Sequence, residues 1–407
     1  MPAEDPMDIR VPDAELRAWI ERIADELCLT VNGQFDHLVR VEVNDDSLEK
    51  LQMLVNFVLD HARRAAEARQ EADRLVRENL TLARQVGTYR ELGHYRLEEI
   101  IGSGGMGEVW RGRHRMLARP AAVKLIRREA LGIHNPDRTI SRFQREARAT
   151  AKLRSPHTIA VYDFGVHEND FYYVMELLEG VDLHTLIQED GVQPPERVAH
   201  ILEQACHSLE EAHRAGLVHR DIKPGNLHLC QYGIDYDFVK VLDFGLVKSF
   251  QDSTEPHLTE DGSFAGTPAF LAPESIVGKR PVDGRADLYA LGHTAYLMLA
   301  GRQCFESSTP FGAAMKQVNE TPVPLSAHPG VKIPEALEKL VMSCLEKDPD
   351  RRPPSAGDLA RELRHSKLAE AWTEDRQRAW WERWWLRHGG RKPESDDSNV
   401  ANELLNP

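Results

Sequence analysis

Two short stretches of this chain carry residue types that could handle phosphate chemistry. Residues 219–226 read HRDIKPGN and residues 243–245 read DFG, so together they supply two carboxylates, one amide and one ammonium. Carboxylate and amide oxygens are hard ligands of the kind that Mg²⁺ prefers, and a lysine ammonium can hold a phosphoryl group as a point charge. We therefore expect a site for Mg²⁺ and a triphosphate, with Asp221 left to face a hydroxyl nucleophile.

The order and spacing of these two stretches resemble the catalytic loop H-R-D-x-x-x-x-N and the D-F-G motif of protein kinases. The resemblance implies that Asp221 orients a hydroxyl and accepts its proton, and that Asn226 and Asp243 hold Mg²⁺. Lys223 would support the transferred phosphoryl oxygens, and a lysine at this place is similar to Ser/Thr rather than Tyr kinases. We expect transfer of the γ-phosphoryl group of ATP to protein Ser/Thr hydroxyls, with autophosphorylation, in signal transduction.

A glycine-rich stretch near Tyr95 must position the phosphates. It reads GSGGMGEV and is followed by further strand-like residues, whereas a dinucleotide-binding fold would continue as a helix. The later AAVK stretch matches the kinase V-A-I-K strand, so by resemblance Lys124 holds the α- and β-phosphates and Glu146 pairs with it. The loop residues expected at the nucleotide are Ile101, Gly102, Ser103, Gly104, Gly105, Met106 and Gly107.

The adenine and ribose contacts are also implied by the resemblance. Met175 would be the gatekeeper, the backbones of Glu176 and Leu178 would bind the adenine edge, and Asp182 would accept from the ribose. The remaining residues expected around the base are Val109, Ala122 and His228. The histidine is a departure, because the family usually has an apolar side chain beneath the adenine; a flat imidazole can stack there.

The elements that position the catalytic loop are expected in a large helical region. Residues 266–274 match the segment that ends in A-P-E, Asp287 matches the acid that anchors the catalytic loop from beneath, and Glu274 should pair with Arg352. The resemblance covers about residues 95–363. It implies an α+β, two-lobed protein-kinase fold, with a small β-rich N-lobe and a large helical C-lobe, flanked by an N-terminal helical or coiled-coil region and a C-terminal helical tail.

The composition argues against several other classes of protein. The chain has 407 residues, 41% hydrophobic content and a net charge of −14, so we expect no nucleic-acid partner. Five scattered cysteines favour a reducing, cytoplasmic location over a disulfide framework. The start of the chain lacks a signal-peptide pattern, and the apolar run Ala286–Ala300 is too short to span a bilayer, so we expect a buried helix and no transmembrane segment.

Residues 47–87 predict a long helix. With Leu51 at heptad position a, the a and d positions are apolar in nine of eleven cases through Val86. This pattern, with Asn79 at an a position, predicts a parallel homodimer; the alternative is a single helix packed on its own kinase domain. We expect four parts in the chain: residues 1–90, a helical, coiled-coil or HAMP-like signalling region; residues 95–365, the kinase domain; residues 366–390, a Trp-rich helical tail; and residues 391–407, a disordered tail.

Two further segments depart from the resemblance. The stretch between Asn226 and Asp243 is longer than the usual kinase hairpin, and its tip is expected to be exposed without assigned chemistry. Residues 371–388 hold five of the seven tryptophans. On a helix they form one aromatic face, which predicts docking on the protein's own kinase lobe; a partner or membrane surface is the alternative.

Two other functional classes remain open from the sequence. A pseudokinase that senses nucleotide or acts as a scaffold would ordinarily lack one of Lys124, Asp221, Asn226 or Asp243, and all four are present. A small-molecule phosphotransferase is disfavoured because residues 266–274 resemble a segment that positions a peptide.

Overall fold

The structure is a computed structural model that describes part of the chain. The described residues are 56, 60, 64, 91–104, 107–126, 144, 145, 147–167, 170–244, 268–278, 280–307, 309–328, 330 and 332–389. The chain divides into two units, residues 1–89 and 90–407, which are considered separately. In the first unit residues 56, 60 and 64 are helical, and Arg64 forms an ion pair with Asp60 at 2.7 Å. Every a and d position of the predicted heptad seam lies outside the described residues.

The second unit begins with a six-stranded antiparallel sheet whose order is β1-β2-β3-β4-β6-β5. Its strands are β1 (Glu91–Leu92), β2 (Tyr95–Gly104), β3 (Gly107–His114), β4 (Pro120–Ile126), β5 (Val161–His167) and β6 (Asp170–Glu176). The central strands β4 and β6 read as near-continuous apolar runs because both of their faces are covered. Ile126, Phe171 and Tyr173 pack with Ala147, which belongs to a short helical stretch.

A second, three-stranded sheet lies at the junction with the helical region and has the order β7-β8-β9. Its strands are β7 (Gly180–Asp182), β8 (Leu227–Tyr232) and β9 (Asp235–Val241). Residues 158 and 241 form a parallel bridge that joins β9 to the segment preceding β5. This small sheet therefore links the strand-rich part of the unit to its helices.

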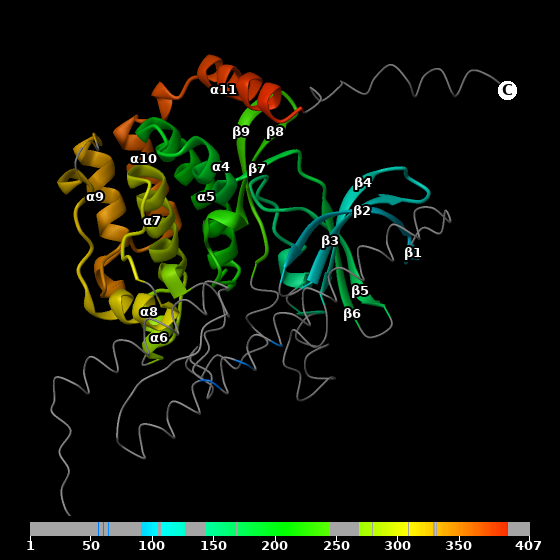
Figure 1. The fold of residues 1–407 in the computed structure, drawn as a ribbon, viewed down its shortest axis with the longest axis horizontal. Helices are drawn as coiled ribbons and strands as arrows, with labels where there is room; N and C mark the ends of the chain where they lie inside the picture. Colours follow the sequence, from blue (N-terminus) through cyan, green and yellow to red (C-terminus); the bar gives the residue numbers. More distant parts are fainter. Residues whose placement is uncertain are drawn as a thin grey trace, which may run out of the picture. The chain divides into compact units, whose positions relative to one another are not determined.

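Apart from these sheets, most of the described part of the second unit is helical (Figure 1). The α-helices are α4 (Leu183–Asp190), α5 (Pro195–Arg214), α6 (Pro273–Val277), α7 (Arg285–Ala300), α8 (Pro310–Asn319), α9 (Glu335–Cys344), α10 (Ala356–Ser366) and α11 (Glu374–Arg387). Short 3₁₀ turns are η2 (Pro224–Asn226), η4 (Pro268–Phe270), η5 (Leu325–Ala327), η6 (Pro349–Arg351) and η7 (Ala369–Ala371).

Helix α7 forms the centre of the helical core. Nearly all of its side chains are buried, including Tyr289 and Leu291 at 0% exposure. The apolar run that begins at Ala286 is therefore a buried helix, as predicted, because other helices cover it on every side. None of the described helices is long and apolar enough to cross a membrane.

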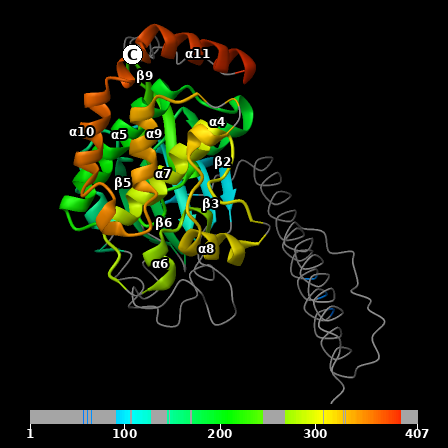
Figure 2. The ribbon, with the colours of Figure 1, turned by 90° about the vertical axis from the view of Figure 1, so that its left-hand side faces the viewer.

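Helix α11 holds most of the tryptophans of the tail. Figures 1 and 2 both show this helix beside β9, at the end of the helical region. Trp380, Trp381 and Trp384 are buried in the same hydrophobic cluster as α5 and α7. In the structure these tryptophans pack on the helical region, which removes a large aromatic area from water.

Candidate active site

The catalytic loop is held from below by a buried carboxylate on α7. Asp287 is 1% exposed; its Oδ2 accepts from the backbone N–H of His219, and its Oδ1 accepts from the N–H of Arg220, both at 2.8 Å. His213 Nε2 lies 2.8 Å from Asp287 Oδ2. The prediction that Asp287 anchors this loop is confirmed, and Arg220 has a left-handed φ of 62° at this support.

His219 supports the loop as a core residue. It is 0% exposed, its Nε2 donates to the carbonyl of Leu242 at 2.6 Å, and its Nδ1 accepts from the N–H of Asp221 at 3.2 Å. Both ring nitrogens are therefore used, as expected for a satisfied core histidine. The ring ties the residue before Asp243 to the loop that carries Asp221.

Two polar side chains of the catalytic loop converge on one carboxylate oxygen of Asp221. Lys223 Nζ lies 2.9 Å from Asp221 Oδ2, and Asn226 Nδ2 lies 3.0 Å from the same atom. Asn226 Nδ2 also donates to the carbonyl of Asp221 at 2.7 Å. Since the amide nitrogen is committed to Asp221, the orientation of both side chains is fixed.

The second expected metal ligand is brought alongside by the β8–β9 hairpin. Leu242 N donates to Asn226 O at 2.9 Å, so Asp243 follows directly after the residue that is bonded to Asn226. Asp243 has a left-handed φ of 56°, which turns the chain sharply after β9. Its carboxylate Oδ2 lies 2.5 Å from Lys124 Nζ, which projects from β4.

The geometry suits Mg²⁺ bound with phosphate. Asn226 Nδ2 points to Asp221, which leaves the amide Oδ1 as an oxygen ligand, and Asp243 adds a carboxylate. Among the described residues no cluster of three or more His, Cys, Asp or Glu could hold a metal by itself. Mg²⁺ usually takes only one or two carboxylates and completes its shell with water and substrate phosphates, so the donor set fits.

The described glycines of the glycine-rich stretch lie at the paired ends of β2 and β3. Gly104 pairs with Gly107 across the hairpin, and Gly102 pairs with Val109. A Cβ on Gly107 would lie 1.8 Å from the carbonyl oxygen of Leu125, so only glycine fits there. Gly105, Met106 and the expected lysine partner Glu146 lie outside the described residues.

The strand that carries Lys124 pairs with the strand that carries the expected gatekeeper. Ala122 lies opposite Met175, and Lys124 lies opposite Tyr173. The side chain of Glu176 accepts from Ala160 N at 2.7 Å. These contacts fix the end of β6, where the adenine edge is expected to bind.

Two residues expected at the nucleotide have structural surroundings that the sequence did not indicate. Asp182 is the N-cap of α4: its Oδ1 accepts from the backbone N–H groups of His184 and Thr185, and its Oδ2 accepts from Thr185 Oγ1. His228 pairs with Asp182 across β7 and β8, and burial lowers the pKa of its ring to about 4, so it is neutral at pH 7. Its Nε2 is buried without a hydrogen-bond partner among the described residues.

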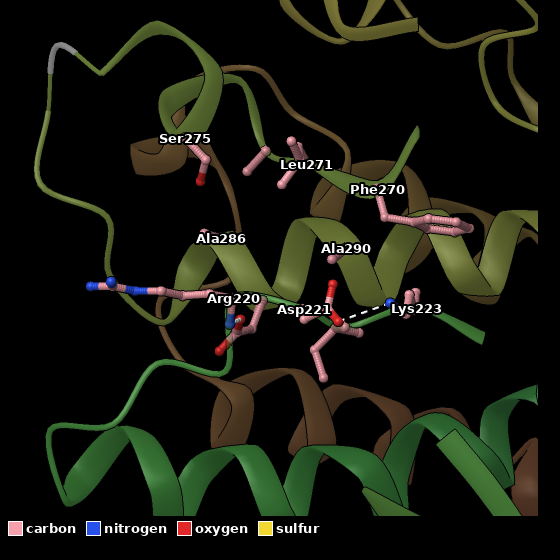
Figure 3. A pocket seen from close by; sticks show the side chains of 11 residues that line it. Arg220, Asp221, Lys223, Phe270, Leu271, Ser275, Ala286 and Ala290 are labelled. Atoms are coloured by element: carbon pink, nitrogen blue, oxygen red, sulfur yellow. Dashed lines mark hydrogen bonds and ion pairs between the residues drawn. The ribbon is translucent and has the colours of Figure 1, made fainter. Parts of the chain in front are cut away.

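A small pocket lies between the catalytic loop and the segment that ends in α6. It has a volume of about 20 Å³ and is lined by Asp221 and Lys223 on one side and by Leu271 and Ser275 on the other. Figure 3 shows Lys223 reaching to Asp221, while the side chain of Arg220 extends away from them. The catalytic loop and the expected peptide-positioning segment therefore face one another.

The predicted ion pair below this segment is present. Glu274 and Arg352 form a two-pronged contact, with NH1–Oε1 at 2.7 Å and NH2–Oε2 at 2.8 Å. Glu274 is 8% and Arg352 is 4% exposed. Arg352 also donates to the carbonyls of Arg285, Glu346 and Lys347, so its remaining N–H groups are used.

The sequence did not reveal the role of the longer hairpin. Its tip is exposed, as expected, with Ile234 at 86% exposure. Nearby, however, Asp237 is 0% exposed and binds Arg197 together with two tail tryptophans. A carboxylate among so many apolar residues is costly to bury alone, and the only sequence signal was the coincidence of an extended hairpin with a Trp-rich tail.

These features agree with comparisons to known proteins. Residues 95–367 match the family described as the protein kinase domain. The chain belongs to this family, and its combination of a strand-rich part with a helical part fits the two-lobed kinase fold.

Its relatives include bacterial serine/threonine-protein kinases. The chain is 40% identical over 273 residues to serine/threonine-protein kinase pkn3 of Myxococcus xanthus, which covers 66% of this chain and 49% of that protein. It is 37% identical over 273 residues to PknB of Mycolicibacterium smegmatis and 35% identical over 274 residues to PknB of Mycobacterium leprae, covering 66% of this chain and 42% of each relative. The matched part thus spans less than half of these curated relatives.

Proposed function

We propose that this protein is an ATP-dependent serine/threonine protein kinase. The observation that carries the proposal is the 2.5 Å ion pair between Lys124 on β4 and Asp243, which follows β9. A second group of contacts accompanies this pair: Lys223 and Asn226 orient the carboxylate of Asp221. Together they form the set of polar groups that phosphoryl transfer to a hydroxyl requires.

Each side chain has a proposed role. Asp221 accepts the proton of the Ser or Thr hydroxyl as that oxygen forms its bond to the γ-phosphorus, and the bond from phosphorus to the β-phosphate oxygen breaks to leave ADP. Lys223 stabilises the transferred oxygens, and Lys124 holds the α- and β-phosphates. Asn226 and Asp243 would hold Mg²⁺, which when bound neutralises charge on the phosphates. The rate then depends on positioning and charge stabilisation.

The remaining nucleotide contacts are proposed from the family resemblance. The backbones of Glu176 and Leu178 bind the adenine edge, with Met175 behind it and Val109 above it. Asp182 is retained at the ribose edge, although three hydrogen bonds within α4 already engage its carboxylate. The neutral imidazole of His228 lies beneath the base.

We also propose the organisation of the whole chain. Residues 1–90 form a signalling region that brings two copies together, residues 95–365 form the kinase domain, residues 366–390 form the docked tail, and residues 391–407 form a disordered end. The scattered cysteines favour a cytoplasmic location. Autophosphorylation between two copies would follow from their raised local concentration.

The test is incorporation of labelled phosphate. Purified protein is incubated with γ-labelled ATP and a mixture of protein substrates, with and without Mg²⁺, and the phosphorylated residues are mapped by mass spectrometry. We expect Mg²⁺-dependent labelling of Ser and Thr. The Asp221→Asn variant, purified identically, controls for a contaminating kinase. Equal labelling by that variant, or no labelling by the wild-type protein, would contradict the proposal.

A further inference from the structure

The C-terminal tail binds a single buried carboxylate on the β8–β9 hairpin. Asp237 Oδ1 accepts from Arg197 NH2 at 2.8 Å and from Trp381 Nε1 at 2.7 Å. Its Oδ2 accepts from Arg197 Nε at 2.8 Å and from Trp372 Nε1 at 2.7 Å. Four donors therefore surround a side chain that is 0% exposed, and two of them come from the tail. A buried carboxylate of this kind depends on having all of its hydrogen bonds.

The backbone around Asp237 is fixed as well. The residue has a left-handed φ of 49°, and its carbonyl accepts from Gln204 Nε2 at 3.0 Å. Gln204 Oε1 accepts in turn from Val239 N at 3.1 Å. Helix α5 thus holds the hairpin on one side, and the tail closes over the carboxylate on the other.

Further polar contacts fasten the outer side of the tail. Trp380 Nε1 and Arg387 NH2 both bond the carboxylate of Asp190, at 2.5 and 2.8 Å. Arg376 pairs with Glu196 at 2.6 Å. The guanidinium of Arg197 stacks over the ring of Trp380, 3.8 Å from its centroid. Specific polar contacts, and not only apolar packing, therefore hold the tail on the helical region.

The hairpin held in this way carries both expected metal ligands at its base. Asn226 immediately precedes β8, and Asp243 follows β9. Asp237 lies six residues before Asp243, about 20 Å along an extended strand. Paired strands move together, and the bond from Leu242 N to Asn226 O joins the two ends. A shift of the hairpin at Asp237 would therefore displace both expected metal ligands.

The same hairpin contacts the segment where adenine is expected to bind. Lys240 on β9 is 2% exposed, and its Nζ lies 2.8 Å from Glu176 Oε1. His157 Nδ1 bonds the carbonyl of Val239 at 3.0 Å. These contacts hold the hairpin on the side that faces the larger sheet, so the hairpin is held by α5, by the tail and by this sheet.

We propose that the C-terminal tail is a positioning element of the active site: Trp372 and Trp381, through Asp237, hold the β8–β9 hairpin so that Asn226 and Asp243 are placed to share one Mg²⁺. Asp237 is a positioning residue, because it acts through the hairpin. This inference rests on the proposed kinase function. Groups that orient metal ligands commonly alter metal affinity or activity by about 10–100-fold when they are removed.

The test compares indole N–H groups on the same tail. Trp372→Phe and Trp381→Phe each keep an aromatic ring but remove one donor to Asp237. Trp385→Phe is the matched control, because Trp385 Nε1 is buried without a hydrogen-bond partner among the described residues. Two quantities are measured in the full chain, at a temperature at which every variant is folded. One is the Mg²⁺ concentration for half-maximal rate at saturating ATP; the other is the calorimetric Kd for ATP with Mg²⁺ and with EDTA.

We expect Trp372→Phe and Trp381→Phe to raise the half-saturating Mg²⁺ concentration about tenfold. They should weaken ATP binding in Mg²⁺ and leave binding in EDTA nearly unchanged, whereas Trp385→Phe should match the wild-type protein. A merely structural tail would lower Tm in the donor variants without changing either Mg²⁺ measurement, and that result would overturn the inference. An equal Mg²⁺ effect in Trp385→Phe would also overturn it.

A further variant separates this inference from the proposed function. Asp243→Asn removes an expected metal ligand and should abolish the Mg²⁺-dependent part of ATP binding. If the wild-type protein binds ATP in a Mg²⁺-dependent manner and Asp243→Asn does not, the proposed site stands. If Trp372→Phe and Trp381→Phe then leave both Mg²⁺ measurements unchanged, only the proposed role of the tail is contradicted. Failure of the wild-type protein to bind ATP would instead contradict the proposed function.

Discussion

Lys124 and Asp243 form an ion pair, with Nζ 2.5 Å from Oδ2, between the middle of β4 and the end of the β8–β9 hairpin. Their side chains are only 15% and 27% exposed. The lysine expected to hold the phosphates is thus paired with the aspartate expected to hold the metal. Phosphates and Mg²⁺ would offer each of these charges a new partner, so binding should separate the pair.

Lys124→Ala and Asp221→Asn should each abolish measurable phosphoryl transfer. Asp221 is expected to take the hydroxyl proton, a step typically worth about 10²–10⁴ in rate, and Lys124 is expected to orient the phosphates. Rates are measured with purified variants under saturating ATP. Circular dichroism and thermal unfolding serve as the control, since we expect the fold to be kept in both. A rate near that of the wild-type protein in either variant would exclude this mechanism.

Glu274→Ala should destabilise the folded protein by about 3–5 kcal/mol, because it leaves the buried guanidinium of Arg352 without its carboxylate. The free energy of unfolding is measured in urea. Glu320→Ala is the comparison: Glu320 pairs with Lys316 at 3.6 Å on the surface, and its loss should cost less than about 1 kcal/mol. If both variants lose a similar free energy of unfolding, the buried pair contributes no more to stability than the surface pair.

Stability should fall in acid partly through His293, which is 0% exposed on α7. Burial, and secondarily the charge of Lys347, lower the pKa of its ring from 6.5 to about 3. Between these two values the unfolded chain binds a proton that the folded chain excludes, so this contribution is present above pH 6.5 and is lost as pH falls toward 3.

The expected size of this effect can be measured by difference. From pH 7 to pH 5 the wild-type protein should lose about 2 kcal/mol more stability than His293→Phe, which has no group to protonate. Urea unfolding at both pH values gives the two differences. The same pH dependence in both proteins would assign the acid sensitivity to other groups.

Phosphate on Thr259 or Ser263 should activate the enzyme. Both residues lie outside the described residues, and the prediction depends on Arg220, an arginine next to Asp221 that can bind phosphate in a bidentate manner. The double alanine variant should be slower by about tenfold, the scale of one or two such charge-assisted hydrogen bonds. Mass spectrometry of the autophosphorylated protein identifies the sites.

The control for this prediction uses other hydroxyls of the same segment. A Ser253→Ala, Thr254→Ala variant should retain full activity. If mass spectrometry finds Thr259 and Ser263 empty in a fully active enzyme, the neighbouring acids Glu260 and Asp261 would be sufficient to order the segment.

The full chain is predicted to be a dimer through residues 47–87. Leu82→Asp places a charge at a d position of the seam and should give a monomer in sedimentation velocity at micromolar concentration. Arg84→Asp, at an outward f position of the same turn, should remain a dimer. A monomeric wild-type protein would favour the alternative in which this helix packs on its own kinase domain.

The sequence by itself determined the features that depend on neighbouring residues. The catalytic loop, the glycine-rich turn and the buried run from Ala286 could be predicted because their motifs or periodicities are local. Kinase resemblance then predicted two distant relationships, the support of the catalytic loop by Asp287 and the Glu274–Arg352 pair, and both are confirmed.

Only the tertiary structure decided which groups use their hydrogen bonds elsewhere. The sequence could not show that Asp182 caps α4, because the same carboxylate was expected at the ribose. Nor could it show that Asp237 would take indole donors from Trp372 and Trp381, 135 and 144 residues later in the chain. A buried carboxylate must find donors wherever the packed chain provides them, and that choice depends on which distant surfaces meet when the apolar faces are buried.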